Sequence, residues 1–147
     1  DRPAILKIAA AQASSRGMAD RFTALPGNYH EIELTAGTYD LAIVGNVTHI
    51  ETESGNRSLF EKLHMALRPG GELAIIDVMP GQTQGDLPRA LYALGLAIRT
   101  ENGQVYPRAD LETLLAETGY EVENFHPLNV PPYTMGMILA RKGGPEC

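Results

Sequence analysis

A length of 147 residues fits one domain with a sizeable apolar core. The apolar fraction of 44% and the charged fraction of 20% are ordinary for a globular protein, and the net charge of -6 argues against nucleic acid or an anionic membrane as the main partner. The single cysteine, Cys147, excludes an internal disulfide and a cysteine-based metal site, so we expect a reducing, cytoplasmic location.

The first part of the chain predicts a helix, a short strand and a turn. Residues 3–16 form the helix, because Pro3 suits the first helical turn and Gly17 suits a helix end. Its expected buried face consists of Ala4, Ile5, Ile8 and Ala9. Residues 20–25 alternate between apolar and polar side chains as a strand does, and residues 26–28 (Pro-Gly-Asn) are typical of a turn.

Residues 40–79 contain the strongest pattern in the chain. Residues 41–44 and 73–78 are short apolar runs, which predict strands that are buried on both faces. Between them, residues 54–68 repeat apolar side chains at helical spacing, and Pro-Gly-Gly at 69–71 ends that helix. A strand, a crossover helix and a second strand of this length predict a βαβ unit with parallel strands.

The last part of the chain predicts two more helices and two more strands. Residues 80–85 read as a loop, and the helices span residues 87–98 and 108–118. The strands span residues 120–125 and 134–140 and are separated by a proline-rich link. Together these elements predict an α/β fold with an open, mostly parallel sheet and a closing antiparallel strand pair. Ligands of such sheets bind beyond the carboxyl ends of the strands.

Several motifs, in this order and spacing, resemble the carboxyl-terminal catalytic domain of class I S-adenosylmethionine-dependent methyltransferases of the small-molecule O-methyltransferase type. They are Asp1-Arg-Pro before a helix, Gly17-Met-Ala-Asp-Arg-Phe22, Gly27-Asn28, Tyr39-Asp-Leu-Ala-Ile-Val-Gly-Asn-Val-Thr-His49, Leu67-Arg-Pro-Gly-Gly-Glu-Leu73, Ile76-Asp77 and Leu114-Leu-Ala-Glu-Thr-Gly-Tyr120. The resemblance implies a Rossmann-like fold, S-adenosylmethionine as the cofactor, and methyl transfer to a hydroxyl of a small, aromatic or polyketide-like acceptor.

The resemblance also implies missing parts. The family's first strand and its Gly-rich loop would lie upstream of Asp1, and that strand belongs in the middle of the sheet. Three explanations are open: the chain is a fragment of a larger enzyme, another molecule supplies the strands, or the remaining strands close the gap. We favour the first, since Asp-Arg-Pro without Met is an odd natural start. We therefore expect weak or no cofactor binding by this chain alone, and homodimerisation only through a missing amino-terminal domain.

The resemblance assigns the cofactor to two groups of residues. Asp1 corresponds to the acid that binds the ribose hydroxyls, for which a carboxylate offers paired acceptor oxygens. The residues implied at the adenine are Gly27, Asn28 and Tyr29, and those implied along the cofactor are Asn46 and Val47. Two alternatives stay open: Asp1 is a solvated terminus, and the Gly-Asn pair is needed only for its turn.

His49 is the candidate general base, by its resemblance to the histidine that deprotonates the acceptor hydroxyl. A histidine suits this task because its ordinary pKa is close to neutral pH. The alternative is a loop histidine that pairs with Glu51 or Glu53. Asp77 resembles an acid that borders the active site, and it could orient the base or satisfy backbone donors. The other histidines and the terminal cysteine do not have metal-ligand spacing, so no metal is expected.

Two other classes of function stay open. A methyltransferase-like module without catalysis is favoured by Asn28, where the family usually has Asp, and by the missing Gly-rich loop. A nicotinamide-dependent dehydrogenase would share the sheet type, but the order of motifs does not resemble one. Besides a second copy of the enzyme, the partner expected is its small-molecule acceptor.

Overall fold

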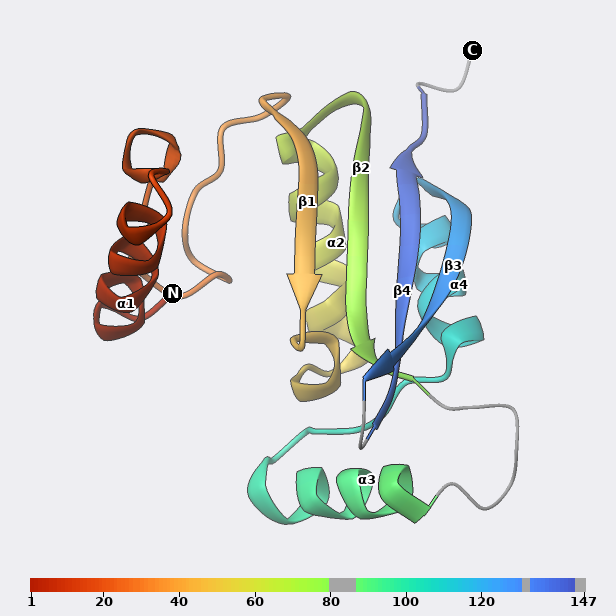
Figure 1. The fold of residues 1–147 in the computed structure, drawn as a ribbon. Coiled ribbons are helices and arrows are strands. Elements are labelled where there is room, and N and C mark those ends of the chain that lie inside the picture. Colours follow the sequence, from red (N-terminus) through yellow and green to blue (C-terminus); the bar gives the residue numbers. More distant parts are fainter. Residues whose placement is uncertain (80–86, 131–132, 145–147) are drawn as a thin grey trace. The chain divides into compact units, whose positions relative to one another are not determined.

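A computed structural model describes residues 1–79, 87–130 and 133–144. The chain forms two compact units, Asp1–Leu34 and Thr35–Cys147. Figure 1 shows the helices and strands of both in the order in which the chain visits them.

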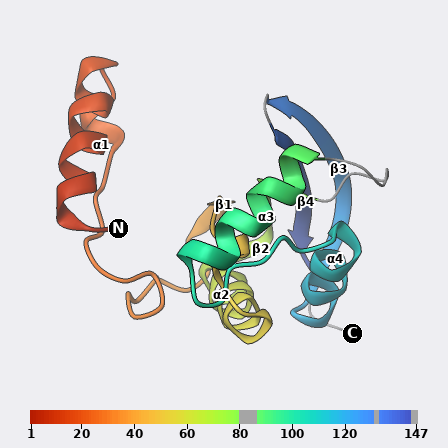
Figure 2. The ribbon, with the colours of Figure 1, turned by 90° about the horizontal axis from the view of Figure 1, so that it is seen from below.

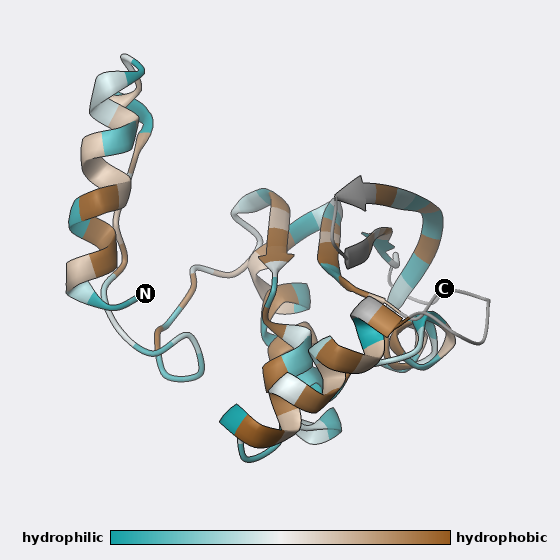
Figure 3. Ribbon diagram, turned by 60° about the horizontal axis from the view of Figure 1, so that its bottom comes forward, coloured by the Kyte–Doolittle hydropathy of each residue, from teal (hydrophilic) through white to brown (hydrophobic). Residues whose placement is uncertain are grey.

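The first unit contains the helix α1 (Pro3–Ser15) and a single 3-10 turn, η1 (Ala19–Arg21). Pro3 occupies the first helical turn, and Gly17 adopts a φ of 67° just after the helix, as predicted. The prediction of a buried face is wrong, because no residue of α1 is buried and Ile8 is 62% exposed. Figure 3 shows the apolar segments of this helix beside the amino terminus. A unit of this size has too little chain to enclose an apolar face.

The predicted strand at residues 20–25 does not form. Its first residues fold into η1 instead, and the described sheet takes no strand from the first unit. A strand is stable only when its backbone groups pair with a neighbour. Two hydrogen bonds connect Asp1 with this segment and the turn after it. The Asp1 amino group donates to the Leu25 carbonyl at 3.1 Å, and the Asp1 carbonyl accepts from the Gly27 N–H at 3.1 Å.

The second unit is built on a four-stranded sheet with the order β1-β2-β4-β3. The strands are β1 (Tyr39–Gly45), β2 (Leu67–Val78), β3 (Tyr120–Val130) and β4 (Tyr133–Lys142). β1 and β2 are parallel, and β4 is antiparallel to both of its neighbours. The α/β class and the antiparallel closing pair are confirmed. The mostly parallel sheet is confirmed as well, since β1, β2 and β3 run in one direction and β4, between β2 and β3, runs in the opposite direction.

The predicted βαβ unit is present. Its helix α2 (Glu53–Ala66) begins where the Thr52 side chain accepts a hydrogen bond from the Gly55 N–H at 3.0 Å. The Pro-Gly-Gly break lies inside β2, as an irregularity in its pairing with β1, and not before the strand. A Cβ atom on Gly71 would meet three backbone carbonyl oxygens at 3.0–3.2 Å, so a side chain there would force the neighbouring backbone to shift by a few tenths of an ångström.

The two strands of the βαβ unit differ in burial. β2 is buried on both faces as predicted, with Leu73 and Ile75 fully covered on one face and Ala74 and Val78 only 5% and 3% exposed on the other. β1 is an edge strand of the described sheet, and its Leu41 and Ile43 are 46% and 64% exposed. The prediction of two buried faces is therefore wrong for β1. Within the second unit, only the face that carries Val44 is covered by packing.

Two further helices complete the second unit. α4 (Arg108–Glu117) lies on the same face of the sheet as α2, and its Leu111, Leu114 and Leu115 are buried as predicted. α3 (Leu87–Arg99) lies instead across the end of the sheet at which β1 and β2 finish (Figures 1 and 2). No helix in the described ranges combines the length and the apolar character that crossing a membrane requires.

The apolar stripe of α3 forms, but it faces outward. Leu91, Leu94 and Ile98 are 58%, 56% and 74% exposed, whereas Leu96 on another side is buried. The predicted loop at 80–85 and the two prolines at 131–132 lie outside the described residues.

His64, where α2 packs against Tyr120 of β3, makes the stability of the fold depend on pH. The His64 ring meets the Tyr120 ring edge-on, with 5.1 Å between centroids. The pKa of His64 is lowered from 6.5, mainly by burial and secondly by the nearby positive charge of Lys142. Below pH 6.5 the unfolded chain therefore binds more protons at His64 than the folded chain, and the free energy of unfolding falls as the pH falls.

We expect urea unfolding to show this loss when the pH is lowered from about 8 to about 5. The His64→Gln variant should lose less stability over the same range, since it carries no group to protonate. His126→Gln is the matched control, because His126 is exposed on β3. An equal pH dependence in wild type and His64→Gln would contradict the assignment to His64.

Candidate active site

The topology explains why His49 and Asp77 meet. β1 and β2 are parallel, so their carboxyl ends lie at one edge of the sheet. Their pairing ends at Gly45 opposite Ile76, and the Asn46 N–H still donates to the Ile76 carbonyl at 2.9 Å. Asp77 is the next residue of β2. His49 lies on the 3-10 turn η2 (Thr48–Ile50), which follows β1 directly.

His49 and Asp77 form a buried pair. Nδ1 of His49 lies 2.6 Å from Oδ1 of Asp77, and the two residues are only 7% and 1% exposed. A carboxylate accepts hydrogen bonds and does not donate them, so the bond puts the ring proton on Nδ1. In the neutral ring, Nε2 is then the atom with a lone pair.

The Asp77 carboxylate accepts from three further donors. The Thr48 hydroxyl donates to Oδ2 at 2.6 Å and the His49 backbone N–H donates to the same oxygen at 3.3 Å. The Val78 N–H donates to Oδ1 at 2.7 Å. Asp77 therefore holds the His49 ring through one oxygen and also satisfies two backbone N–H donors.

Tyr92 of α3 covers the other nitrogen of His49. Its hydroxyl lies 3.1 Å from Nε2, and the two rings meet edge-on at a centroid distance of 5.5 Å. Sequence reasoning missed Tyr92. A tyrosine in an amphipathic helix has no sequence pattern that marks it as a site residue. The one available indication was that Tyr92 follows Asp77 closely in the chain.

Two contacts hold the η2 turn in place from other elements. Asn56 of α2 is fully buried, and its Nδ2 donates to the Thr48 carbonyl at 3.0 Å. The Gln104 N–H donates to the His49 carbonyl at 2.9 Å. The alternative in which His49 pairs with Glu51 or Glu53 is wrong, because its ring is held by Asp77.

The residues predicted at the ribose and the adenine lie together in the first unit. Asp1 is next to Gly27 through the backbone bond between them, and Oδ1 of Asp1 accepts from the Arg2 N–H at 2.6 Å. Asn28 makes a local turn, in which Oδ1 accepts from the His30 N–H at 3.1 Å and Nδ2 donates to Glu31 at 3.2 Å.

Tyr29 is half-buried in the first unit, with its ring 4.4 Å from the ring of His30. The two other residues predicted along the cofactor lie in the second unit, just before η2. Asn46 is exposed and has a φ of 55°, and Val47 is half-buried. A positive φ is uncommon outside glycine, but asparagine tolerates it better than most residues. It lets the chain turn sharply at the end of β1 and reach η2.

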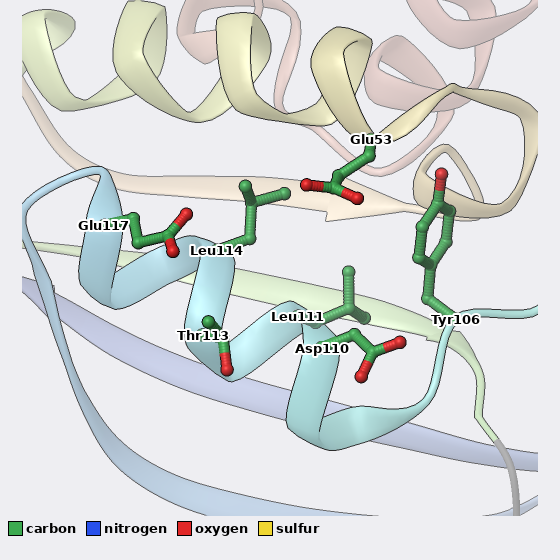
Figure 4. A pocket seen from close by; sticks show the side chains of 7 residues that line it. All are labelled: Glu53, Tyr106, Asp110, Leu111, Thr113, Leu114 and Glu117. Atoms are coloured by element: carbon green, nitrogen blue, oxygen red, sulfur yellow. The ribbon is translucent and has the colours of Figure 1, made fainter.

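A hollow of about 210 Å³ lies between α2 and α4, away from the predicted site residues. Its lining residues are Glu53, Tyr106, Asp110, Leu111, Thr113, Leu114 and Glu117. Figure 4 shows the three carboxylates spread around it without converging on one point. The described residues contain no group of three or more potential metal ligands.

A family model for the O-methyltransferase domain matches residues 1–121 of this chain. The chain belongs to this family. The resemblance to S-adenosylmethionine-dependent O-methyltransferases is therefore confirmed at the level of the family.

Similar proteins include both O- and C-methyltransferases. L-tyrosine C(3)-methyltransferase of Streptomyces lavendulae is 33% identical over 130 residues, which are 86% of this chain and 35% of that protein. A crystal structure of an O-methyltransferase family 2 protein from Planctomyces limnophilus, in complex with apigenin, superposes with a TM-score of 0.83 at 28% identity. It covers 97% of this chain, which matches 42% of that one.

A third neighbour shows the same fold at lower identity. Human N-acetylserotonin methyltransferase in complex with SAM superposes with a TM-score of 0.67 at 24% identity, over 87% of this chain and 38% of that one. This chain thus spans about a third of the curated relative and about two-fifths of the solved structures named here.

Proposed function

We propose that these residues belong to an enzyme that transfers the methyl group of S-adenosylmethionine to a hydroxyl of a small molecule, with His49 as the general base. The observation that carries this proposal is the buried pair of His49 and Asp77 at the carboxyl ends of two parallel strands. A histidine oriented through one nitrogen by a carboxylate presents its other nitrogen in a fixed direction, as proton abstraction from an acceptor requires.

The geometry suggests a simple course for the reaction. The acceptor hydroxyl donates a hydrogen bond to Nε2 of His49, and Nε2 takes the proton as the oxygen becomes nucleophilic. Asp77 stabilises the imidazolium that forms, because its carboxylate already accepts from Nδ1. S-adenosylmethionine, when bound, supplies an electrophilic methyl group. Holding the acceptor oxygen in line with that group supplies much of the rate enhancement.

The chemistry of the first unit fits the nucleoside part of this cofactor. Asp1 is exposed and offers a carboxylate with paired acceptor oxygens, as binding two neighbouring hydroxyls requires. Tyr29 offers an aromatic ring next to the Gly27–Asn28 turn. We assign the ribose to Asp1, the adenine to Gly27, Asn28 and Tyr29, and the path between nucleoside and acceptor to Asn46 and Val47.

Methylation of carbon is a second candidate for the same base. The 33% identical relative is named for transfer to C(3) of L-tyrosine, a ring carbon next to a phenol hydroxyl. Removing a phenol proton places negative charge on the oxygen and on the neighbouring ring carbons. His49 could therefore serve either outcome, and the position of the acceptor would decide which atom is methylated.

The activity is proposed for a longer protein that contains these residues, since the chain matches only 35% of the curated relative. In that protein the second unit would supply the base. The alternative, a module without catalysis, would have no use for a buried base aligned by a carboxylate. The proposal includes a reducing, cytoplasmic location.

Calorimetric titration with S-adenosylhomocysteine tests the cofactor part of the proposal. This demethylated cofactor product is titrated into the 147-residue chain and into the longer protein that contains it. We expect binding by the longer protein, and weak or no binding by the chain alone. Binding by neither would contradict the methyltransferase proposal and favour the non-catalytic module.

A further inference from the structure

Two adjacent residues of η2 place three hydrogen-bond donors on the Asp77 carboxylate. Nδ1 of His49 donates to Oδ1 at 2.6 Å, and the Thr48 hydroxyl donates to Oδ2 at the same distance. The His49 backbone N–H donates to Oδ2 at the longer distance of 3.3 Å. The Thr48 hydroxyl is therefore the strong donor on Oδ2, since charge-assisted bonds from a hydroxyl to a carboxylate have lengths of about 2.5–2.7 Å.

We propose that Thr48 is a positioning residue for the reaction: its hydroxyl fixes the rotation of the Asp77 carboxylate and thereby the direction in which His49 presents Nε2. The proposal rests on the proposed role of His49 as the base. Thr48 is only 1% exposed, so it acts through Asp77 and does not contact an acceptor.

The Asp77 carboxylate needs such a donor because its last torsion is soft. The terminal bond of an aspartate side chain has a broad, roughly two-fold rotation profile, unlike the staggered bonds nearer the backbone. The two other close donors, Nδ1 of His49 and the Val78 N–H at 2.7 Å, both reach Oδ1. They hold that oxygen but leave the plane of the carboxylate free to turn about it. A strong donor on Oδ2 fixes the plane, and with it the lone pair that Oδ1 offers to the ring.

The Thr48 hydroxyl is itself held in place. The side chain is branched at Cβ, which restricts its χ1 rotation. The Thr48 carbonyl accepts from Nδ2 of Asn56 at 3.0 Å and from the Glu51 N–H at 3.3 Å. Thr48 thus ties η2 to α2 through its main chain and to β2 through its side chain.

Asn56 indicates that this arrangement is kept at a cost in stability. Asn56 is fully buried, and its Oδ1 has no hydrogen-bond partner within the described ranges. An unpaired buried acceptor destabilises a fold, and an apolar side chain of similar size would avoid that cost. Such a side chain could not donate to the Thr48 carbonyl. The buried amide therefore serves to hold Thr48, and through it the hydroxyl on Asp77.

The test compares Thr48→Val, which keeps the branched shape and removes the hydroxyl, with Thr48→Ser, which keeps the hydroxyl. The kcat of the longer protein, for methyl transfer to an acceptor that wild type methylates, should fall at least about tenfold in Thr48→Val, because misplacing a reacting group by about 1 Å can cost about 10²-fold. KM should stay within about twofold of wild type, since a buried positioning residue does not bind the acceptor. Thr48→Ser should recover most of the lost kcat.

Nuclear magnetic resonance reads the His49 ring directly in the 147-residue chain without cofactor. In wild type we expect one sharp signal from the proton on Nδ1, at the low field typical of a short bond to a carboxylate. Thr48→Val should broaden or shift this signal, and Thr48→Ser should restore it. A role in stability alone would lower the urea midpoint and leave the ring signal of the folded molecules unchanged.

Thr113→Val is the matched control. The Thr113 hydroxyl donates to the Ala109 carbonyl of its own helix, α4, at 2.9 Å, and the residue is exposed. This change should leave kcat and the His49 signal as in wild type. If Thr48→Val does not fold, the hydroxyl proton of Thr48 in wild type decides. A buried hydroxyl bound to a carboxylate exchanges slowly with water and gives a signal of its own.

Three results would overturn the proposal. They are a folded Thr48→Val variant with kcat within about twofold of wild type, an unchanged Nδ1 signal in that variant, and a Thr48 hydroxyl proton that exchanges as freely as one in an exposed side chain. Absence of methyl transfer by wild type would count against the proposed function instead. The ring signals, read without cofactor or acceptor, decide the role of Thr48 in either case.

Discussion

Replacing His49 by Gln in the longer protein should lower the rate of methyl transfer by about 10²–10⁴-fold, the usual contribution of a general base. Gln has a similar size and polarity, so the acceptor should still bind, and the loss should appear in kcat more than in KM. The physical reason is that Asp77 holds Nδ1 of His49, which leaves Nε2 as the proton acceptor on the side of Tyr92.

Transfer of a labelled methyl group to an aromatic hydroxyl acceptor that the wild-type protein methylates, under steady-state conditions, measures this effect. His126→Gln is the control for the loss of a histidine, because His126 is exposed on β3. A His49→Gln variant that keeps more than about a tenth of the wild-type kcat would exclude His49 as the base, since a general base contributes more than that.

Replacing Asp77 by Asn should impair both stability and activity. The carboxylate is 1% exposed and accepts from Thr48, Val78 and two donors of His49. The amide of Asn has one acceptor oxygen, so at least one buried donor would face an NH₂ group. We expect the free energy of unfolding to fall by about 3 kcal/mol, at the upper end for buried polar groups that lose a partner.

The same substitution should move the proton on the His49 ring. The Asn amide can donate to Nδ1, and the ring proton would then sit on Nε2, where it blocks proton abstraction. We expect kcat to fall by about 10²-fold or more, because the base is present in the wrong tautomer. Urea unfolding and the methyl-transfer assay measure the two effects.

Asp110→Asn is the matched control for this change, since Asp110 is exposed on α4, an element that carries neither His49 nor Tyr92. It should leave kcat and stability close to wild type. If Asp77→Asn unfolds at the same urea concentration as wild type and retains its kcat, Asp77 neither supports the fold nor orients the base.

The central features of the site could be predicted from sequence because they depend on local patterns. Two apolar runs separated by an amphipathic helix predict parallel strands, and parallel strands bring their carboxyl ends to one edge. This placed His49 and Asp77 near each other although they are 28 residues apart. The ends of helices that are followed by glycine, such as the helix before Gly119, could be predicted equally well.

Burial of the apolar residues was less predictable, because it depends on packing against elements that are distant in the sequence. Residues 20–25 alternate like a strand but find no neighbouring strand, so they form a turn and an irregular segment. Ile43 lies in an apolar run yet is exposed, because β1 is at the edge of the described sheet. The outer stripe of α3 shows the same difference between amphipathic pattern and actual packing.

The rest of the site depends on contacts between side chains that are distant in the chain. Tyr92 lies 43 residues from His49, and nothing in the helix pattern distinguishes it from a packing residue. Asn56 sits on a helix face that reads as apolar, and only its bond to the Thr48 carbonyl explains a buried amide there. Thr48 was passed over because a hydroxyl next to a candidate base has no sequence signature.

The most direct test of this account is the tautomer of His49 in the wild-type chain, measured by nitrogen-15 nuclear magnetic resonance at about pH 8, where ordinary histidines are neutral. We predict a neutral ring with the proton on Nδ1 and with Nε2 accepting from the Tyr92 hydroxyl. A neutral ring with the proton on Nε2, or a ring without a hydrogen bond to Asp77, would contradict the assignment of His49 as a base aligned for proton abstraction.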